Sequence, residues 1–213
     1  MSQEETCRAC DGMTIPTPRD PSVSTTLRLR KPMPSAKRRL PHHARLAQQV
    51  DPAIRRELRA VWEGRSPWPV FLHGPAGTGK TSIGLVALDA TRGIYLTAAQ
   101  LCEQMRRAML GELVDYGTHG ESRITQDDLW RPWADADLAV LDELGARERV
   151  SDFGYDTIKR ALDERDGRPL IAISNIGPRE IRAIYDDRIV SRLCRGTVID
   201  VVGPDRRLCR RET

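Results

Sequence analysis

The segment GPAGTGKT, residues 74–81, constrains the fold of this chain more than any other stretch. It follows the short apolar run PVFLHG and opens a segment of helical character that runs to about residue 90. A G-x-x-x-x-G-K-T loop between a strand and a helix lets backbone N–H groups surround a phosphate at the helix N-terminus, where the helix dipole favours anions. A chance match in a glycine-rich turn is the alternative, but the strand and the helix on either side favour a phosphate-binding loop.

The residue types in this loop predict a nucleoside triphosphate and Mg²⁺ as its ligands. Lys80 can reach the β- and γ-phosphates, and the hydroxyl of Thr81 can bind Mg²⁺. The candidate nucleotide-binding residues of the loop are Gly74, Pro75, Ala76, Gly77, Thr78, Gly79, Lys80, Thr81 and Ser82.

Short apolar runs alternate with amphipathic segments along the rest of the chain. A first helix is expected from Asp51-Pro52, an N-cap followed by proline at the first helical position. Continuous apolar runs separated by amphipathic helices indicate an α/β fold, in which helices cover both faces of a parallel sheet. The expected strands are residues 69–74, 93–97, 137–142, 169–174 and 197–202.

Two carboxylates end the expected strand that contains LAVLDE. Open α/β sheets bind ligands at the C-terminal ends of their strands, so Asp142 and Glu143 are candidates for the chemistry. Asp142 would hold Mg²⁺ in its outer shell, and Glu143 would polarise an attacking water. The alternative is a pair of acids that begin a polar loop.

Ser174-Asn175 ends the next expected strand, after LIAI. The Asn175 amide could orient the attacking water or contact the γ-phosphate. By itself Ser-Asn also forms ordinary turns, so the prediction depends on the two upstream motifs.

Arg188, Arg192 and Arg195 lie at i, i+4 and i+7 near the C-terminus, so on a helix they line one face. Like charges at this spacing repel by about 0.2–0.5 kcal/mol per pair. No acidic residue lies three or four positions from Arg192. The stripe therefore indicates an external anion, and a solvated or DNA-facing basic helix is the alternative.

Taken in order, the segments GPAGTGKT, LAVLDELGA, ISN, DDRIVSRL and VIDVVGPDRR resemble the AAA+ ATPases of the bacterial helicase-loader type. DnaC-like loaders and IstB-like transposition helpers are the similar groups, and the resemblance covers about residues 66–207. It implies a P-loop NTPase sheet of order 5-1-4-3-2, with Asn175 between the P-loop and the Asp142–Glu143 strand. It also implies an extra helix within residues 98–137. Because the sequence ends at Thr213, we expect no substantial lid domain, which is a departure from larger AAA+ proteins.

The resemblance also assigns roles to individual residues. Arg192 matches an arginine finger that reaches the ATP of a neighbouring subunit, and Arg188 matches the basic residue one turn earlier. Arg207 matches a second sensing arginine. The implied cofactors are ATP and Mg²⁺, and the implied activity is ATP hydrolysis with Lys80, Glu143, Asn175 and Arg192 as its catalytic residues.

The implied function is an ATPase that forms a homo-oligomer on single-stranded DNA and loads or remodels a replicative helicase during DNA replication. An IstB-like transposition helper, whose partner is a transposase, shares every motif. A small-molecule P-loop kinase is a further alternative, but it leaves Glu143 and Arg192 unexplained. The last alternative is a nucleotide-gated binding module with little ATP turnover.

Residues 1–50 differ in composition from the rest of the chain. They hold six of the fourteen prolines, and residues 21–50 contain seven Lys or Arg and no Asp or Glu. Such a segment buries too little apolar surface to offset its ordering entropy, so we predict a flexible basic arm over 1–50, an AAA+ domain over 51–207 and a tail over 208–213. The arm could bind nucleic-acid phosphates, contact a partner helicase or be a solvated linker.

Five cysteines without even spacing argue against a disulfide framework and for a reducing compartment. Cys7-x-x-Cys10 is half of a zinc site that His42 and His43 could complete, and two exposed thiols are the alternative. No stretch approaches 18 consecutive apolar residues, and the N-terminus lacks a signal-peptide core. We therefore expect a soluble, cytoplasmic protein with no membrane partner.

Overall fold

The computed structural model of the chain describes residues 50–89, 91, 93–111, 113–115, 121–123, 125–146 and 149–205. The predicted arm and tail lie outside these residues, apart from Val50. In chain order the elements are α2 (Pro52–Trp62), β1 (Val70–His73), α3 (Lys80–Asp89), β2 (Ile94–Thr97), α4 (Ala98–Met109), β3 (Leu113–Asp115), β4 (Glu121–Arg123), α5 (Gln126–Asp135), β5 (Ala139–Leu144), α6 (Asp152–Asp163), β6 (Leu170–Ser174), α7 (Pro178–Ile184), α8 (Asp187–Cys194) and β7 (Thr197–Asp200).

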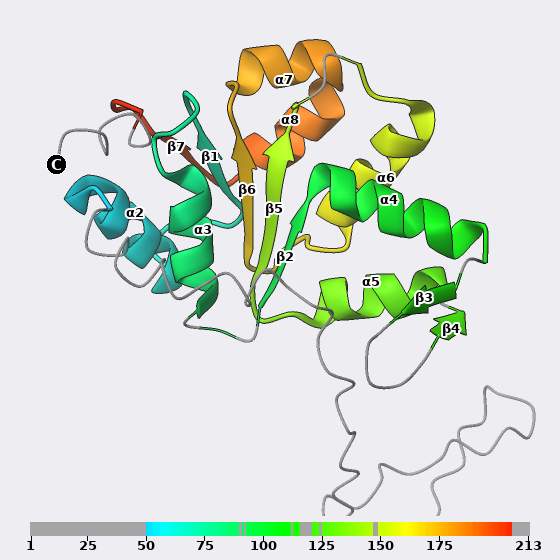
Figure 1. Cartoon of the computed structure of the whole chain (residues 1–213). Coiled ribbons are helices and arrows are strands. Elements are labelled where there is room, and N and C mark those ends of the chain that lie inside the picture. Colours follow the sequence, from blue (N-terminus) through cyan, green and yellow to red (C-terminus); the bar gives the residue numbers. More distant parts are fainter. Residues whose placement is uncertain are drawn as a thin grey trace, which may run out of the picture. The chain divides into compact units, whose positions relative to one another are not determined.

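Five parallel strands form the central sheet in the order β2-β5-β6-β1-β7 (Figure 1). Val70 of β1 pairs with Ile171 of β6 on one side and with Thr197 of β7 on the other. Numbering the five strands by their place in the chain and starting from β7 gives 5-1-4-3-2, so the predicted order is confirmed. β6 lies between β1 and β5, which places the end of β6 beside both the P-loop and the acidic pair.

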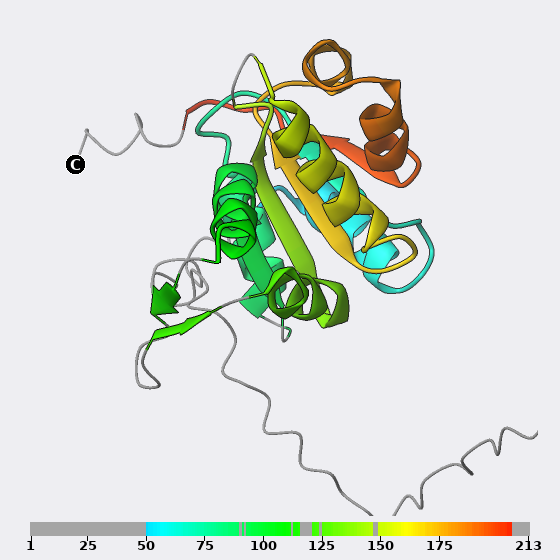
Figure 2. The same cartoon turned by 90° about the vertical axis from the view of Figure 1, so that its right-hand side faces the viewer.

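The alternation of side chains along the strands divides the core into two layers. Val70 and Leu72 of β1 pack on one face with α2 and α3, whereas Phe71 packs on the other face with α4, α5, α6, α7 and α8. Figure 1 shows α3 on one side of the sheet and α4 on the other, and in Figure 2 α4 and α6 lie in front of β5 and β6. Helices therefore cover both faces, as the continuous apolar runs predicted.

The segment between β2 and β5 contains a hairpin that was not expected there, besides helices. It holds α4, the antiparallel hairpin β3–β4 and α5. Both helices begin with a capping box, formed by Thr97 with Gln100 and by Thr125 with Asp128. Each box satisfies two backbone N–H groups that a helix start leaves without partners, which explains where α4 and α5 begin.

The helix before β1 begins as its sequence predicted. The Asp51 carboxylate accepts a hydrogen bond from the backbone N–H of Ala53 at 2.7 Å, and Pro52 is the first helical residue. Ile54 and Val61 are the buried residues of α2, and they pack in the core layer that also contains α3. Among the described residues, no helix is both long enough and apolar enough to cross a bilayer.

Candidate active site

The predicted P-loop connects β1 to α3 at the C-terminal edge of the sheet. Gly74 and Gly77 have φ angles of 137° and 80°, which side-chain-bearing residues rarely adopt. A Cβ atom on Gly74 would lie 2.4 Å from the carbonyl oxygen of Val201, and one on Gly77 would lie 2.0 Å from a carboxylate oxygen of Asp205. The backbone of the segment after β7 therefore excludes a side chain at position 74, whereas at position 77 the φ angle favours glycine and the Asp205 side chain would have to move.

Lys80 is the first residue of α3, and only 4% of its surface is exposed. Its ammonium donates hydrogen bonds of 2.6 Å to the carbonyl oxygens of Gly74 and Pro75, so it lies within the curve of the loop. A buried ammonium gains more from an anionic ligand than from neutral carbonyls. The position of Lys80 therefore suits a phosphate bound by the loop.

The structure brings Thr81 and Asp142 together from positions 61 residues apart. The Thr81 hydroxyl donates a hydrogen bond of 2.8 Å to Oδ2 of Asp142, whose side chain is buried at the end of β5. Hydroxyl and carboxylate oxygens are ligands that Mg²⁺ prefers, directly or through water. This pair fits the predicted Mg²⁺ site, with the phosphates supplying the remaining oxygens.

Glu143 has an unusual backbone conformation at the edge of the site. Its φ is 59°, and the β5–β6 register shifts between Leu141 and Leu144. The Glu143 N–H donates a hydrogen bond of 2.7 Å to Oδ1 of Asp142, and the Glu143 side chain is exposed. A non-glycine residue in this region of φ is strained, which is common at functional positions. The bulge leaves Asp142 buried and gives Glu143 access to solvent.

Ser174 has a role that the sequence did not reveal. Its buried hydroxyl donates a hydrogen bond of 2.7 Å to the carbonyl oxygen of Leu144 and accepts one of 3.1 Å from the N–H of Ile176. Ser174 thereby joins the end of β6 to the chain directly after Glu143. Asn175 follows with an exposed side chain. It lies at the strand end between the P-loop and the acidic pair, where the resemblance placed it.

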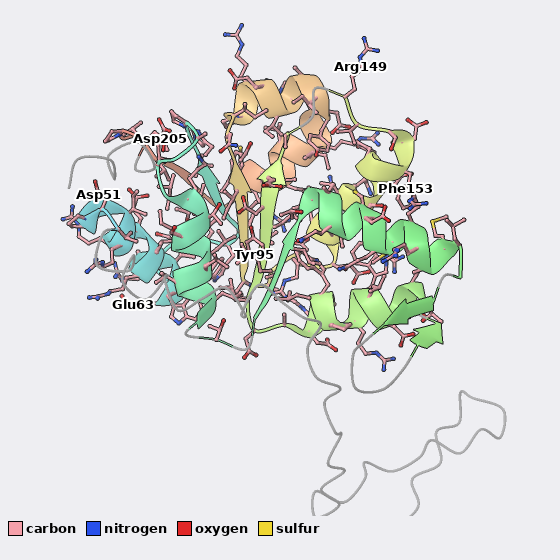
Figure 3. The ribbon with its side chains drawn as sticks, in the orientation of Figure 1. Asp51, Glu63, Tyr95, Arg149, Phe153 and Asp205 are labelled. Atoms are coloured by element: carbon pink, nitrogen blue, oxygen red, sulfur yellow. The ribbon has the colours of Figure 1, made fainter. Side chains whose placement is uncertain are left out.

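Tyr95 of β2 is a second site residue that sequence reasoning missed (Figure 3). Its phenol donates a hydrogen bond of 2.8 Å to Oδ2 of Asp142. Burial and the neighbouring Asp142 charge raise the pKa of Tyr95 well above its usual range. The one available signal was its place in GIYLT, a strand expected beside the Asp142 strand.

The arginine stripe lies on α8, and its acidic partners come from α6. Arg192 Nε lies 2.5 Å from Oδ1 of Asp163, and Arg195 forms an ion pair with Asp166. The guanidinium of Arg192 also donates to the carbonyl oxygen of Arg188, whose own side chain is exposed. The repulsion among these arginines is therefore relieved within the chain. The acids that relieve it lie about thirty residues away in the sequence, so helical spacing around Arg192 could not reveal them.

The N-terminus of α8 is fixed by a tyrosine and an aspartate. Asp186 accepts a hydrogen bond of 2.9 Å from the N–H of Ile189 through Oδ1 and one of 2.7 Å from the Tyr155 hydroxyl through Oδ2. These hydrogen bonds hold the pKa of Asp186 below its usual range, the bond from Tyr155 contributing most. Tyr155 belongs to α6, so α6 orients both ends of the helix that carries Arg192.

Several predicted residues cannot be placed. Arg207, Cys7 and Cys10 lie outside the described residues, as do His42 and His43. The segment that leads toward Arg207 is tied to β1, since the Val201 N–H donates a hydrogen bond of 2.7 Å to the carbonyl oxygen of His73. Over the part of the chain that the structure describes, no cluster of three or more His, Cys, Asp or Glu side chains could hold a metal ion.

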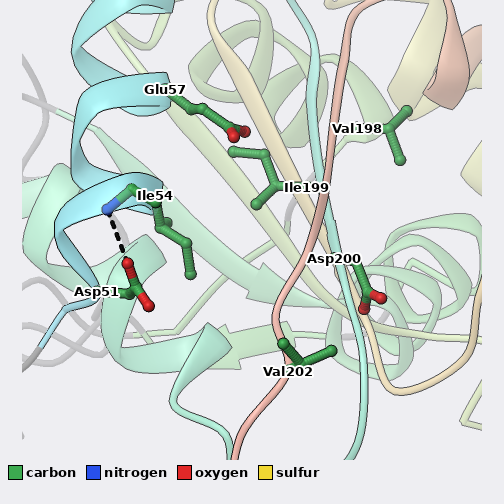
Figure 4. A pocket seen from close by; sticks show the side chains of 8 residues that line it. Asp51, Ile54, Glu57, Val198, Ile199, Asp200 and Val202 are labelled. Atoms are coloured by element: carbon green, nitrogen blue, oxygen red, sulfur yellow. Dashed lines mark hydrogen bonds between the residues drawn. The ribbon is translucent and has the colours of Figure 1, made fainter.

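A separate hollow lies between α2 and β7 (Figure 4). Three carboxylates line it, from Asp51, Glu57 and Asp200, and that negative charge disfavours a phosphate ligand. The hollow is therefore a poor second candidate for the nucleotide. Its complete lining is Asp51, Ala53, Ile54, Glu57, Val198, Ile199, Asp200 and Val202.

Comparisons with known proteins give matches in structure alone, because no protein-family model and no curated protein matches the sequence. A structure of DnaA from Aquifex aeolicus bound to AMPPCP has a TM-score of 0.55 at 19% identity, over 71% of this chain and 47% of that one. The replication initiator DnaA bound to AMPPCP and single-stranded DNA has a TM-score of 0.52 at 20% identity, over 64% of this chain and 40% of that one. A structure of DnaI has a TM-score of 0.51 at 22% identity, over 72% of this chain and 82% of that one.

This chain thus spans less than half of the two DnaA chains and most of the DnaI chain. With the strand order 5-1-4-3-2, the chain has the fold of an AAA+ P-loop domain.

Proposed function

We propose that this chain is a cytoplasmic ATPase that binds and hydrolyses ATP, assembles on single-stranded DNA and loads or remodels a replicative helicase. The observation that carries the proposal is the hydrogen bond from Thr81 to Asp142 beside the buried ammonium of Lys80. It joins the helix that follows the phosphate-binding loop to a carboxylate on β5, across the end of β6, in a sheet with the strand order of an AAA+ domain.

Each residue of the site has its own role in hydrolysis. Lys80 and the loop N–H groups bind the phosphates, while Thr81 and Asp142 hold Mg²⁺, which when bound neutralises charge on the phosphate oxygens. Glu143 accepts a proton from the attacking water, and Asn175 orients that water from the neighbouring strand. Arg192 of an adjacent subunit stabilises the charge that develops on the γ-phosphate. The exposure of Glu143 and Asn175 supports these roles, because a water must reach both side chains.

The proposed partners follow from charge and from the structural matches. One matching DnaA structure contains single-stranded DNA. The basic segment over residues 21–50 leads directly into α2, which exposes Arg55, Arg56 and Arg59. Positive charge of this kind binds the phosphate backbone without reading sequence. The helicase partner rests on the resemblance of the motifs to helicase loaders, and the homo-oligomer rests on the position of Arg192.

ATP turnover measured with and without single-stranded DNA tests this proposal. We expect hydrolysis that single-stranded DNA stimulates and that Lys80→Ala abolishes, because this change removes the cation facing the β- and γ-phosphates. Arg65→Ala is the matched control, since Arg65 is also a cation but is exposed and pairs with Glu63 after α2. Phosphate transfer that requires a small-molecule acceptor, with no response to DNA, would instead indicate a kinase.

A further inference from the structure

Tyr95 connects β2 to the carboxylate at the end of β5. β2 and β5 are paired strands in which Tyr95 lies opposite Val140 and Thr97 lies opposite Asp142. From this position the phenol reaches diagonally to Oδ2 of Asp142, at 2.8 Å. The same oxygen accepts the Thr81 hydroxyl at 2.8 Å, so two hydroxyl donors converge on one carboxylate oxygen.

The two oxygens of Asp142 are held by different kinds of donor. Oδ1 accepts the backbone N–H of Glu143 at 2.7 Å, and Oδ2 accepts the Thr81 and Tyr95 hydroxyls. These three bonds together fix both the rotamer and the plane of the carboxylate. A hydrogen bond to a charged acceptor is roughly twice as strong as one between neutral groups.

The surroundings of the Tyr95 phenol favour its protonated, donating form. Burial raises its pKa most, followed by the charge of Asp142, the hydrogen bond to it and the charge of Glu143.

The two hydroxyls that donate to Oδ2 differ in what else the proposed function requires of them. Thr81 would hold Mg²⁺ through its hydroxyl oxygen, in addition to its bond to Asp142. Tyr95 comes from a different strand and has no such second task. It is then the side-chain donor dedicated to holding Oδ2 in place.

We propose that Tyr95 is a positioning residue that holds Asp142 in its metal-binding orientation and thereby sets the Mg²⁺ concentration needed for nucleotide binding. The inference rests on the proposed function, because it assigns Asp142 to the Mg²⁺ site. Removing an outer partner of a metal ligand typically costs about 10–100-fold in metal affinity or activity. Asp142 keeps the Glu143 N–H, so we expect the lower part of that range.

Tyr95→Phe tests the inference because it removes one oxygen and leaves the ring packed in the core layer beside α3. The full chain is titrated with Mg²⁺ in the presence of a fluorescent ATP analogue. The half-saturating Mg²⁺ concentration should rise about tenfold in the variant. Affinity for the analogue without Mg²⁺ should stay unchanged, and turnover at saturating Mg²⁺ should return to within about twofold of wild type.

Tyr155→Phe is the matched control, since it also removes a hydroxyl that donates to a carboxylate oxygen, at 2.7 Å from Asp186. It should leave the half-saturating Mg²⁺ concentration at the wild-type value. An unchanged value in Tyr95→Phe would overturn the inference while leaving the proposed function intact, and so would an equal rise in both variants. A wild-type chain that binds no nucleotide at any Mg²⁺ concentration would overturn the proposed function itself.

Discussion

Arg192 Nε of α8 lies 2.5 Å from Oδ1 of Asp163 at the end of α6. Arg195 and Asp166, each three residues further along, form a second ion pair between the same two segments. The arginine proposed to act on a neighbouring subunit is therefore bound within its own chain. Reaching another subunit requires Arg192 to leave Asp163, so this ion pair competes with assembly of the active site.

Asp163→Asn should raise ATP turnover at low protein concentration, because it removes the charge that competes for Arg192. Exposed ion pairs contribute at most about 1 kcal/mol, which limits the gain to about fivefold. The hydrogen bond from Arg192 lowers the pKa of Asp163, so the pair is complete at neutral pH and is lost only as the pH falls through that lowered value. Asp166→Asn is the control, because Asp166 pairs with Arg195 and not with Arg192. Equal rates for the two variants and the wild type would show that the pair does not restrain Arg192.

Glu143→Gly should fold at least as stably as the wild type while losing its ATPase activity. Glycine adopts a φ of 59° without strain, and relieving one strained residue is worth about 1 kcal/mol. Part of that gain is lost to the greater entropy of glycine in the unfolded chain. Urea denaturation followed by circular dichroism measures the difference. A clear loss of stability would mean that the Glu143 side chain contributes to the fold.

Glu143→Gln should bind ATP with near wild-type affinity and hydrolyse it about 10²–10⁴ times more slowly, because the amide cannot accept a proton from water. Glu63→Gln is the control, since Glu63 is exposed and pairs with Arg65 after α2. Nucleotide binding and phosphate release are measured on the same samples. Unchanged turnover in Glu143→Gln would mean that another residue accepts the proton from the attacking water.

Arg165→Met should lower the free energy of unfolding by about 3 kcal/mol, because it leaves several buried carbonyl oxygens without a donor. Arg165 is 2% exposed, and its guanidinium donates to the carbonyl oxygens of Ala134 at 2.9 Å and Ala136 at 2.8 Å, at the C-terminal end of α5. Burial lowers the pKa of Arg165 to about 10, so the group remains charged at neutral pH. Arg168→Ala, at an exposed neighbour, should cost less than about 1 kcal/mol in the same urea titration. Similar losses in both variants would contradict the role of Arg165.

The parts of the structure that follow from short-range patterns were predictable from the sequence. All five strands of the sheet match the expected apolar runs, and the residues of the P-loop and the acidic pair are defined by local spacing. α7 was missed because its seven residues bury only Ile181, which is too little for an apolar stripe. The hairpin β3–β4 was missed because each strand has three residues, which is too short to show the alternation of apolar and polar residues that indicates a strand.

The contacts that complete the site depend on segments far apart in the chain. Tyr95 lies 47 residues from Asp142, and Ser174 lies 30 residues from Leu144. Tyr95 belongs to no motif, and the Ser174-Asn175 motif does not indicate the contact with Leu144, because both contacts arise through strand pairing. Asp163 is a further example, because an acid near the end of α6 has no local relation to an arginine on α8.

The central claim is that each active site combines Glu143 of one subunit with Arg192 of the next, and a mixing measurement tests it most directly. Glu143→Gln and Arg192→Ala should each be almost inactive alone, since a trans-acting arginine is worth about 10³–10⁵ in rate. In an equal mixture, about one quarter of randomly formed head-to-tail interfaces join an intact Glu143 to an intact Arg192. ATP turnover of the mixture should therefore recover to about a quarter of the wild-type value. A mixture no more active than the sum of its two components would contradict the account.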